Sequence, residues 1–174
     1  MAAHLEIDVW QGEIAELEVD ALVIGASESL FMTAGSAATV KRRGGATIER
    51  DAVDQGPIAP GSVVVTSGGE LATPYVVHAV AVGHDRVADP ARLAAAVRAA
   101  VALADPLKLR RMAFALLGIE HGAFTAAEAA ETLVATLVEA AEGTTLESVV
   151  IATLHADETR AVADAIARHG ATIS

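Results

Sequence analysis

The sequence predicts an α/β protein of three layers, in which helices cover both faces of a mixed, mostly parallel β-sheet. Segments typical of strands alternate with segments typical of helices from end to end. Residues 20–26 form a continuous apolar run, as in strands that are buried on both faces. Hydrophobic residues make up 53% of the chain but aromatic residues only 3%, so small side chains are expected to let helices pack closely on the sheet. The 174 residues fit one domain, residues 1–174.

The predicted strands alternate in polarity or are rich in β-branched residues. They comprise residues 4–10, 20–26, 62–69, 75–82, 110–118 and 146–155. Helices are expected late in residues 27–45, in residues 46–56 and 89–105, after Thr125, and in residues 157–170. Three of these helices carry start signals. Asp89 is the expected N-cap before Pro90, Thr125 and Glu128 have the spacing of a capping box, and Asp157 is the expected N-cap of the last helix.

Composition excludes several classes of function. The chain has no cysteine, so it has no disulfide, thiolate metal site or cysteine nucleophile. The net charge of −11 argues against a nucleic-acid partner, because phosphate contacts need clustered Lys and Arg. The histidines lack paired metal-ligand spacing, so we expect no metal and no cofactor. No apolar run approaches the ~20 residues that span a bilayer, and Glu6 and Asp8 interrupt the region of a signal peptide. We therefore expect a cytoplasmic protein with no membrane partner.

Candidate binding residues follow the predicted strands, because ligands of open α/β sheets bind beyond the carboxyl ends of the strands. Small residues at 33–38 would let a ligand approach the backbone, and Gly35 can adopt a positive φ. Residues 118–124 precede a capped helix start, where unpaired N–H groups can hold a phosphate without lysine. Glu120 opposes that interpretation, because its carboxylate repels phosphate unless it swings into solvent or pairs with His121. On pattern alone, an ordinary turn is the alternative.

The order of several segments resembles that of the macro domain family. Residues 8–23, "DVWQGEIAELEVDALV", resemble the opening strand of the family and its Gly-Asp-Ile turn, with Glu13 in place of the aspartate. Residues 41–83 resemble the middle third of the family, including a helix that ends in Gly-Gly and a Tyr-Val-Ile-His strand. Residues 110–124, "RRMAFALLGIEHGAF", resemble its second phosphate loop. The likeness covers nearly the whole chain.

This resemblance implies binding of ADP-ribose or a related nucleotide. Glu13 would accept the adenine amino group, backbone N–H groups in two loops would hold the phosphates, Phe124 would border the distal ribose, and His155 would lie against adenine. The implied ligand-binding residues are Glu13, Ile14, Ser27, Gly35, Ser36, Ala37, Ala38, Gly118, Ile119, Glu120, His121, Gly122, Ala123, Phe124 and His155.

The sequence departs from the family at positions that carry chemistry. Ile24 and Ser27 stand where the family has asparagines, and Ala37 stands where many hydrolytic members have a water-activating aspartate. General acid–base help is typically worth ~100- to 10,000-fold in rate, so we expect little or no hydrolysis. One alternative is an ADP-ribose-1″-phosphate phosphatase or ADP-ribosyl hydrolase with His121 as its general base. Another is a divergent scaffold with a different ligand or a protein partner. The oligomeric state stays open.

Overall fold

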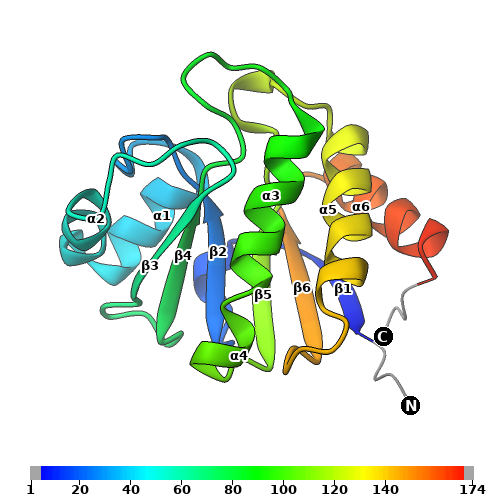
Figure 1. The fold of residues 1–174 in the computed structure, drawn as a ribbon, viewed down its shortest axis with the longest axis horizontal. Helices are drawn as coiled ribbons and strands as arrows, with labels where there is room; N and C mark the ends of the chain where they lie inside the picture. The colour runs from blue at the N-terminus through cyan, green and yellow to red at the C-terminus, as the bar shows by residue number, and fades with distance from the viewer. Residues whose placement is uncertain (1–4, 171–174) are drawn as a thin grey trace.

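A six-stranded β-sheet forms the centre of the molecule (Figure 1). The computed structural model describes residues 5–170. The strands are β1 (Glu6–Gln11), β2 (Ala21–Gly25), β3 (Val63–Ser67), β4 (Tyr75–Ala79), β5 (Arg111–Ala115) and β6 (Ser148–Thr153). Their order is β1-β6-β5-β2-β4-β3, and all neighbours are parallel except β3 and β4. The predicted mixed, mostly parallel sheet is confirmed.

Helices cover both faces of this sheet, which confirms the predicted three layers. They are α1 (Gly35–Gly44), α2 (Ala46–Val53), α3 (Pro90–Val101), α4 (Ala104–Leu107), α5 (Ala126–Ala140) and α6 (Ala156–Arg168), with short 3-10 turns η1 (Ile14–Glu16) and η2 (Glu120–Gly122). Figure 1 shows α3 and α5 in front of the strands. Among residues 5–170, no helix is long and apolar enough to cross a membrane.

The two largest apolar clusters of the described residues fill the space between the layers. Successive residues of a strand point to opposite faces, so β5 contributes to both clusters. Met112 and Phe114 pack with residues of α3, α5 and α6, whereas Ala113 packs with residues of η1, α1 and α2. Alanines such as Ala96 and Ala129 are completely buried on the helices, so the helix backbones lie close to the sheet.

Two of the predicted helix starts are confirmed by their hydrogen bonds. The Asp89 side chain accepts the N–H of Ala91 at 2.9 Å, with Pro90 as the first residue of α3. At α5 the Glu128 N–H donates to Thr125 Oγ1 at 3.1 Å, and the Thr125 N–H donates to Glu128 Oε1 at 3.0 Å. Both arrangements satisfy N–H groups that the first helical turn leaves without a backbone acceptor.

The prediction for the start of the last helix was wrong. Helix α6 begins at Ala156, so His155 occupies the N-cap position and Asp157 lies within the first turn. The carboxylate of Glu158 reaches back and accepts the N–H groups of Leu154 (3.0 Å) and His155 (3.2 Å). The capping function therefore belongs to Glu158, because a carboxylate in the third helical position can reach the N–H groups that precede the helix.

The predicted strands extend beyond the observed ones, most clearly at the ends of β4 and β5. β4 ends at Ala79 and β5 at Ala115, although the apolar runs continue for three and two residues respectively. Val80, Leu116 and Leu117 are nevertheless buried, so the continuing hydrophobicity reflects loops that fold back over the core. The predicted first strand starts at residue 4, which lies outside the described residues.

His78 lies in β4 and has no exposed surface. Its Nε2 is 3.0 Å from Thr66 Oγ1 on neighbouring β3, and its Nδ1 has no hydrogen-bond partner within residues 5–170. Burial lowers the pKa of His78 from 6.5 to about 4, because the charged imidazolium loses its hydration in the core. The neutral ring is therefore the form that the folded protein holds.

We predict that His78 makes the protein sensitive to mild acid. Its pKa is lower in the folded than in the unfolded state, so its favourable contribution is complete above pH 6.5 and is lost as the pH falls toward about 4. At 1.36 kcal/mol per pKa unit, the loss approaches roughly 3 kcal/mol in the free energy of unfolding. Urea unfolding at several pH values measures it. His78→Gln should show a shallower decline over this range than the wild type or the surface variant His84→Gln, and equal declines would contradict the prediction.

Candidate functional site

Two adjacent hollows lie at the carboxyl ends of the strands. The first, of about 360 Å³, lies beyond β2 and β4, and the second, of about 440 Å³, lies beyond β1, β5 and β6. Gly35, Ser36 and Glu120 line both hollows, so the two form one elongated cleft with these residues at the junction. Figure 1 shows the loops that follow β4 and β5 at the same upper end of the sheet. The location agrees with the expectation for an open α/β sheet.

The amino terminus of α1 opens onto this junction. Ala34 occupies the N-cap position with extended backbone, no side chain caps the helix, and its first turn contains no acidic residue. Gly35 has a φ of 60°, a left-handed conformation that favours glycine, and the space where a side chain would project is open. Backbone N–H groups of a first helical turn lack intrahelical acceptors and carry partial positive charge. This helix end can therefore hold an anion at the junction.

The loop after β5 satisfies most of its own backbone donors. The Gly122 N–H donates to the Ile119 carbonyl at 3.1 Å, the Ala123 N–H to the Glu120 carbonyl at 3.1 Å, and the Phe124 N–H to the Gly118 carbonyl at 3.0 Å. These three bonds close a compact turn around η2. The loop therefore offers a ligand fewer free N–H groups than its sequence suggests.

The Glu120 side chain accepts a hydrogen bond from a further backbone N–H group of the same loop. Its Oε2 accepts the Gly118 N–H at 2.7 Å, and its Oε1 lies so close to Gly25 that any side chain at that position would collide with it. The carboxylate thus neither swings into solvent nor forms an ion pair with His121 among the described residues. Burial raises the pKa of Glu120, and the hydrogen bond from Gly118 partly opposes this by stabilising the charged form.

The structure brings most of the residues selected from the sequence to the cleft. Those that line the first hollow are Ser27, Gly35, Ser36, Ala37, Glu120 and His121. Those that line the second hollow are Glu13, Ile14, Gly35, Ser36, Ile119 and Glu120. Those that line neither hollow are Ala38, Gly118, Gly122, Ala123, Phe124 and His155.

The structure changes the interpretation of two residues that line neither hollow. Phe124 is only 4% exposed, because its ring packs into the space that Gly118 leaves without a side chain. It belongs to the core beneath the cleft and lines neither hollow. Leu154, which is 51% exposed, lines the second hollow where His155 was expected. The predicted end of the last strand lay two residues too late, and this displaced the expected wall residue.

The loop between β4 and α3 supplies residues that sequence reasoning did not select. Val82, Gly83, His84 and Arg86 line the first hollow. Arg86 has a φ of 57°, and its side chain forms no ion pair within the described part of the chain. The sequence signal that could have identified these residues is a histidine and an arginine directly after a buried strand. The loop that follows such a strand lies at the carboxyl edge of the sheet, next to the cleft.

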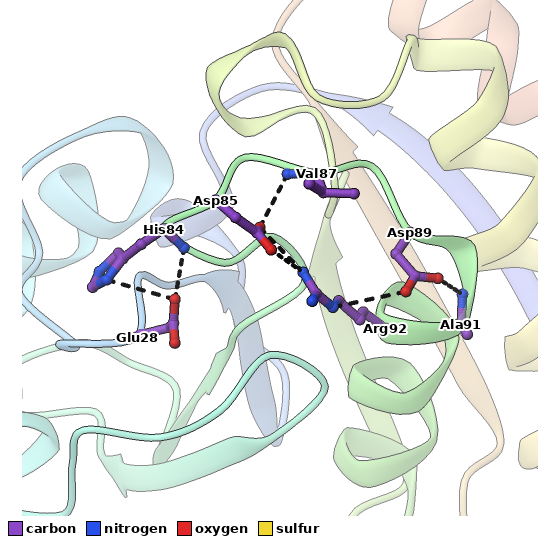
Figure 2. Close-up of polar contacts among 7 residues, drawn as sticks. All are labelled: Glu28, His84, Asp85, Val87, Asp89, Ala91 and Arg92. Carbon is purple, nitrogen blue, oxygen red and sulfur yellow. Dashed lines mark hydrogen bonds and ion pairs between the residues drawn. The ribbon is translucent and has the colours of Figure 1, made fainter.

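Figure 2 shows how this loop is held. The carboxylate of Glu28, from the loop after β2, accepts the His84 N–H at 2.6 Å. On the other side, Arg92 of α3 donates to both oxygens of Asp85, at 2.9 and 3.1 Å, and its Nε lies 3.7 Å from an oxygen of Asp89. The Arg92 hydrogen bond holds the pKa of Asp85 below its ordinary value. The rim of the first hollow is therefore tied to both β2 and α3.

The comparisons with known proteins agree with this architecture. The sequence model of the macro domain matches residues 23–133, more than half of the chain. The chain belongs to the macro domain family. A macro domain-containing protein of Cupriavidus necator is 36% identical over 146 residues, covering 79% of this chain and 82% of that protein. An uncharacterised protein of Mycobacterium tuberculosis is 31% identical over 130 residues, covering 75% of this chain. The matched region spans only 36% of that mycobacterial protein.

Solved macrodomains share the fold of this macro domain at low sequence identity. A variant of the Oceanobacillus iheyensis macrodomain superposes with a TM-score of 0.85 at 19% identity, covering 97% of this chain and 96% of that one. The Trypanosoma brucei macrodomain, solved in complex with ADP-ribose, gives a TM-score of 0.85 at 21% identity, covering 92% of this chain and 69% of that one. Within residues 5–170 of the present macro domain, no group of three or more acidic or histidine side chains is placed to hold a metal ion.

We predict that neutralising Glu120 stabilises this macro domain at neutral pH. Its pKa is higher in the folded than in the unfolded state, so its favourable contribution is complete below the unfolded value of 4.5 and is lost as the pH rises through the folded value. Glu120→Gln retains an acceptor for Gly118 and carries no charge. Its thermal unfolding midpoint should exceed that of the wild type at pH 8, and the difference should shrink toward pH 4.5.

The matched control is Glu142→Gln, because Glu142 is exposed on the surface beyond the end of α5. This change should leave the midpoint within experimental error at both pH values. A Glu120→Gln protein that unfolds at a lower temperature than the wild type at pH 8 would show that the carboxylate stabilises the loop.

Proposed function

We propose that this macro domain binds ADP-ribose or a related ADP-ribosyl nucleotide along its cleft, with little or no hydrolysis. The observation that carries the proposal is the uncapped amino terminus of α1, which opens between two hollows of about 360 and 440 Å³. A ligand with an anionic centre and a sugar or base at each end matches this arrangement. The Trypanosoma brucei macrodomain with ADP-ribose and the Oceanobacillus iheyensis macrodomain with ADP share the fold and support the same ligand class.

The second hollow suits the adenine end. The carboxylate of Glu13 can accept hydrogen bonds from an amino group, and the half-exposed side chain of Leu154 offers apolar surface to a ring. Binding of a nucleobase would remove that apolar surface from water, which is favourable. The orientation therefore places the base beyond β1 and β6.

The proposed position of the base also sets the positions of the diphosphate and the distal ribose. The phosphates would accept N–H groups of Gly35, Ser36 and Ala37 in the first turn of α1, while Ser27 and His121 border the ribose in the first hollow. Because the net charge of the protein is −11, its overall field repels an anionic ligand. Affinity must therefore come from these local donors.

Little hydrolysis is expected because Ala37 has no acid–base capacity and is buried beside the first hollow. The second candidate function is an ADP-ribose-1″-phosphate phosphatase or ADP-ribosyl hydrolase. The observation in its favour is His121, whose exposed side chain lines the first hollow and can act as a general base. A protein partner or another ligand remains the third possibility for a macro domain with a changed cleft.

We predict that Ser36→Glu weakens binding of ADP-ribose, because it places a carboxylate at the second position of α1, on the proposed phosphate site. Isothermal titration with ADP-ribose measures the change, with AMP and NAD as comparison ligands. The loss should exceed tenfold in Kd, since a like charge would face the diphosphate.

Ala127→Glu is the matched control, because Ala127 is exposed and holds the same second position in α5. Acidic residues in a first helical turn are favourable for the helix, so both variants should fold. Equal affinity of Ser36→Glu and the wild type for ADP-ribose would show that the amino terminus of α1 does not bind the phosphates.

We predict no substantial release of ADP-ribose from an ADP-ribosylated protein substrate by the wild type. The double variant Ala37→Asp, Ser27→Asn supplies the aspartate and asparagine that the resemblance implies for hydrolytic members. It should gain turnover if the ligand lies as proposed. Chromatographic measurement of released ADP-ribose decides the question, after thermal unfolding has shown that the double variant folds. Substantial wild-type turnover that His121→Ala abolishes would instead support the second candidate.

A further inference from the structure

The Glu120 carboxylate is an anion that the protein itself places at the junction of the two hollows. Glu120 lines both hollows, and so do Gly35 and Ser36 at the amino terminus of α1. A diphosphate that spans the cleft must pass between this helix end and the carboxylate. Three loop donors do little to offset the resulting repulsion, because the Gly118 N–H donates to Glu120 itself and the Gly122 and Ala123 N–H groups donate to loop carbonyls.

The carboxylate is confined in this position. Its Oε2 is fixed by the hydrogen bond from Gly118, and its Oε1 lies against Gly25 at the end of β2, where only a residue without a side chain leaves room for it. Its displacement would expose the buried Gly118 N–H and leave a gap over Gly25. Uptake of a proton requires no such movement, because a protonated carboxyl still accepts the Gly118 N–H through one oxygen and donates through the other.

We propose that Glu120 couples nucleotide binding to proton uptake, so that a diphosphate ligand occupies the junction together with a protonated Glu120 carboxyl that donates its O–H to a phosphate oxygen. This inference rests on the proposed function. One proton passes from solvent to Glu120 for each ligand bound, and no covalent bond of the ligand changes. Burial of Glu120, which already raises its pKa, supports uptake of that proton at a higher pH than an exposed glutamate allows.

Other titratable groups face the same cleft and must be separated from Glu120. Glu13 after β1 and Glu158 of α6 line the second hollow. His84 and Arg86 after β4, with His121 of the loop itself, line the first hollow. The first turn of α1 and residues 25–27 contribute none. The two histidines can also exchange protons with solvent, so each needs its own control.

Isothermal titration with ADP-ribose between pH 5.5 and 8, in buffers of different ionisation enthalpy, measures both affinity and protons taken up. For the wild type we expect uptake that approaches one proton per ligand above the pKa of Glu120, and affinity that falls by up to about tenfold per pH unit there. Glu120→Gln should bind at pH 8 more tightly than the wild type, with a much weaker dependence on pH. Glu120→Gly, which removes the side chain, should behave in the same way.

Three controls assign the effect. In His84→Gln and His121→Gln, whatever the change in affinity, the number of protons taken up per bound ligand should equal that of the wild type. Adenosine, which has no phosphate, should bind the wild type and Glu120→Gln with equal affinity at every pH. Proton uptake that persists in Glu120→Gln, or a weaker affinity of this variant for ADP-ribose at pH 8, would overturn the role of Glu120 while leaving nucleotide binding in place. Absence of ADP-ribose binding to the wild type and to both Glu120 variants at every pH would overturn the proposed function as well.

Discussion

The parallel register of the strands is the constraint on which the cleft depends. Ile24 pairs with His78 and Gly25 with Ala79, so β2 and β4 end at the same level of the sheet. β1 and β6 likewise end together, at Gln11 and Thr153. Parallel pairing therefore delivers the loops that follow five strands to one edge, while β3 alone runs in the opposite direction.

At that edge, the chemistry is a competition between two local charges. The amino terminus of α1 presents donors and partial positive charge, and the loop after β5 presents the carboxylate of Glu120. The overall charge of −11 adds to the electrostatic free energy that is needed to bring an anion into the cleft. The protonation state of Glu120 thus directly sets the charge that the loop after β5 presents to the junction.

The sequence was sufficient for the fold, because hydrophobic periodicity and the start signals at Asp89 and Thr125 are local properties of the chain. It failed where an outcome depends on a neighbour in space. Apolar runs continued past β4 and β5, so the pattern alone did not show where pairing stops. Glu158 rather than Asp157 caps α6, because the reach of a side chain decides it. Likewise, the sequence predicted free N–H groups in the loop after β5, whereas the structure shows several of them in internal hydrogen bonds.

Open space persists at the junction of the cleft in this macro domain. A site that had lost its ligand through filling would carry a bulky apolar side chain at the junction. Here the two hollows remain, the residues at the junction from α1 are Gly35 and Ser36, and the group that faces them is a carboxylate. Gly25 leaves room for that carboxylate, so the end of β2 and the loop after β5 fit each other. This fit explains how the cleft holds an acidic group at its junction while the path between the two hollows stays open.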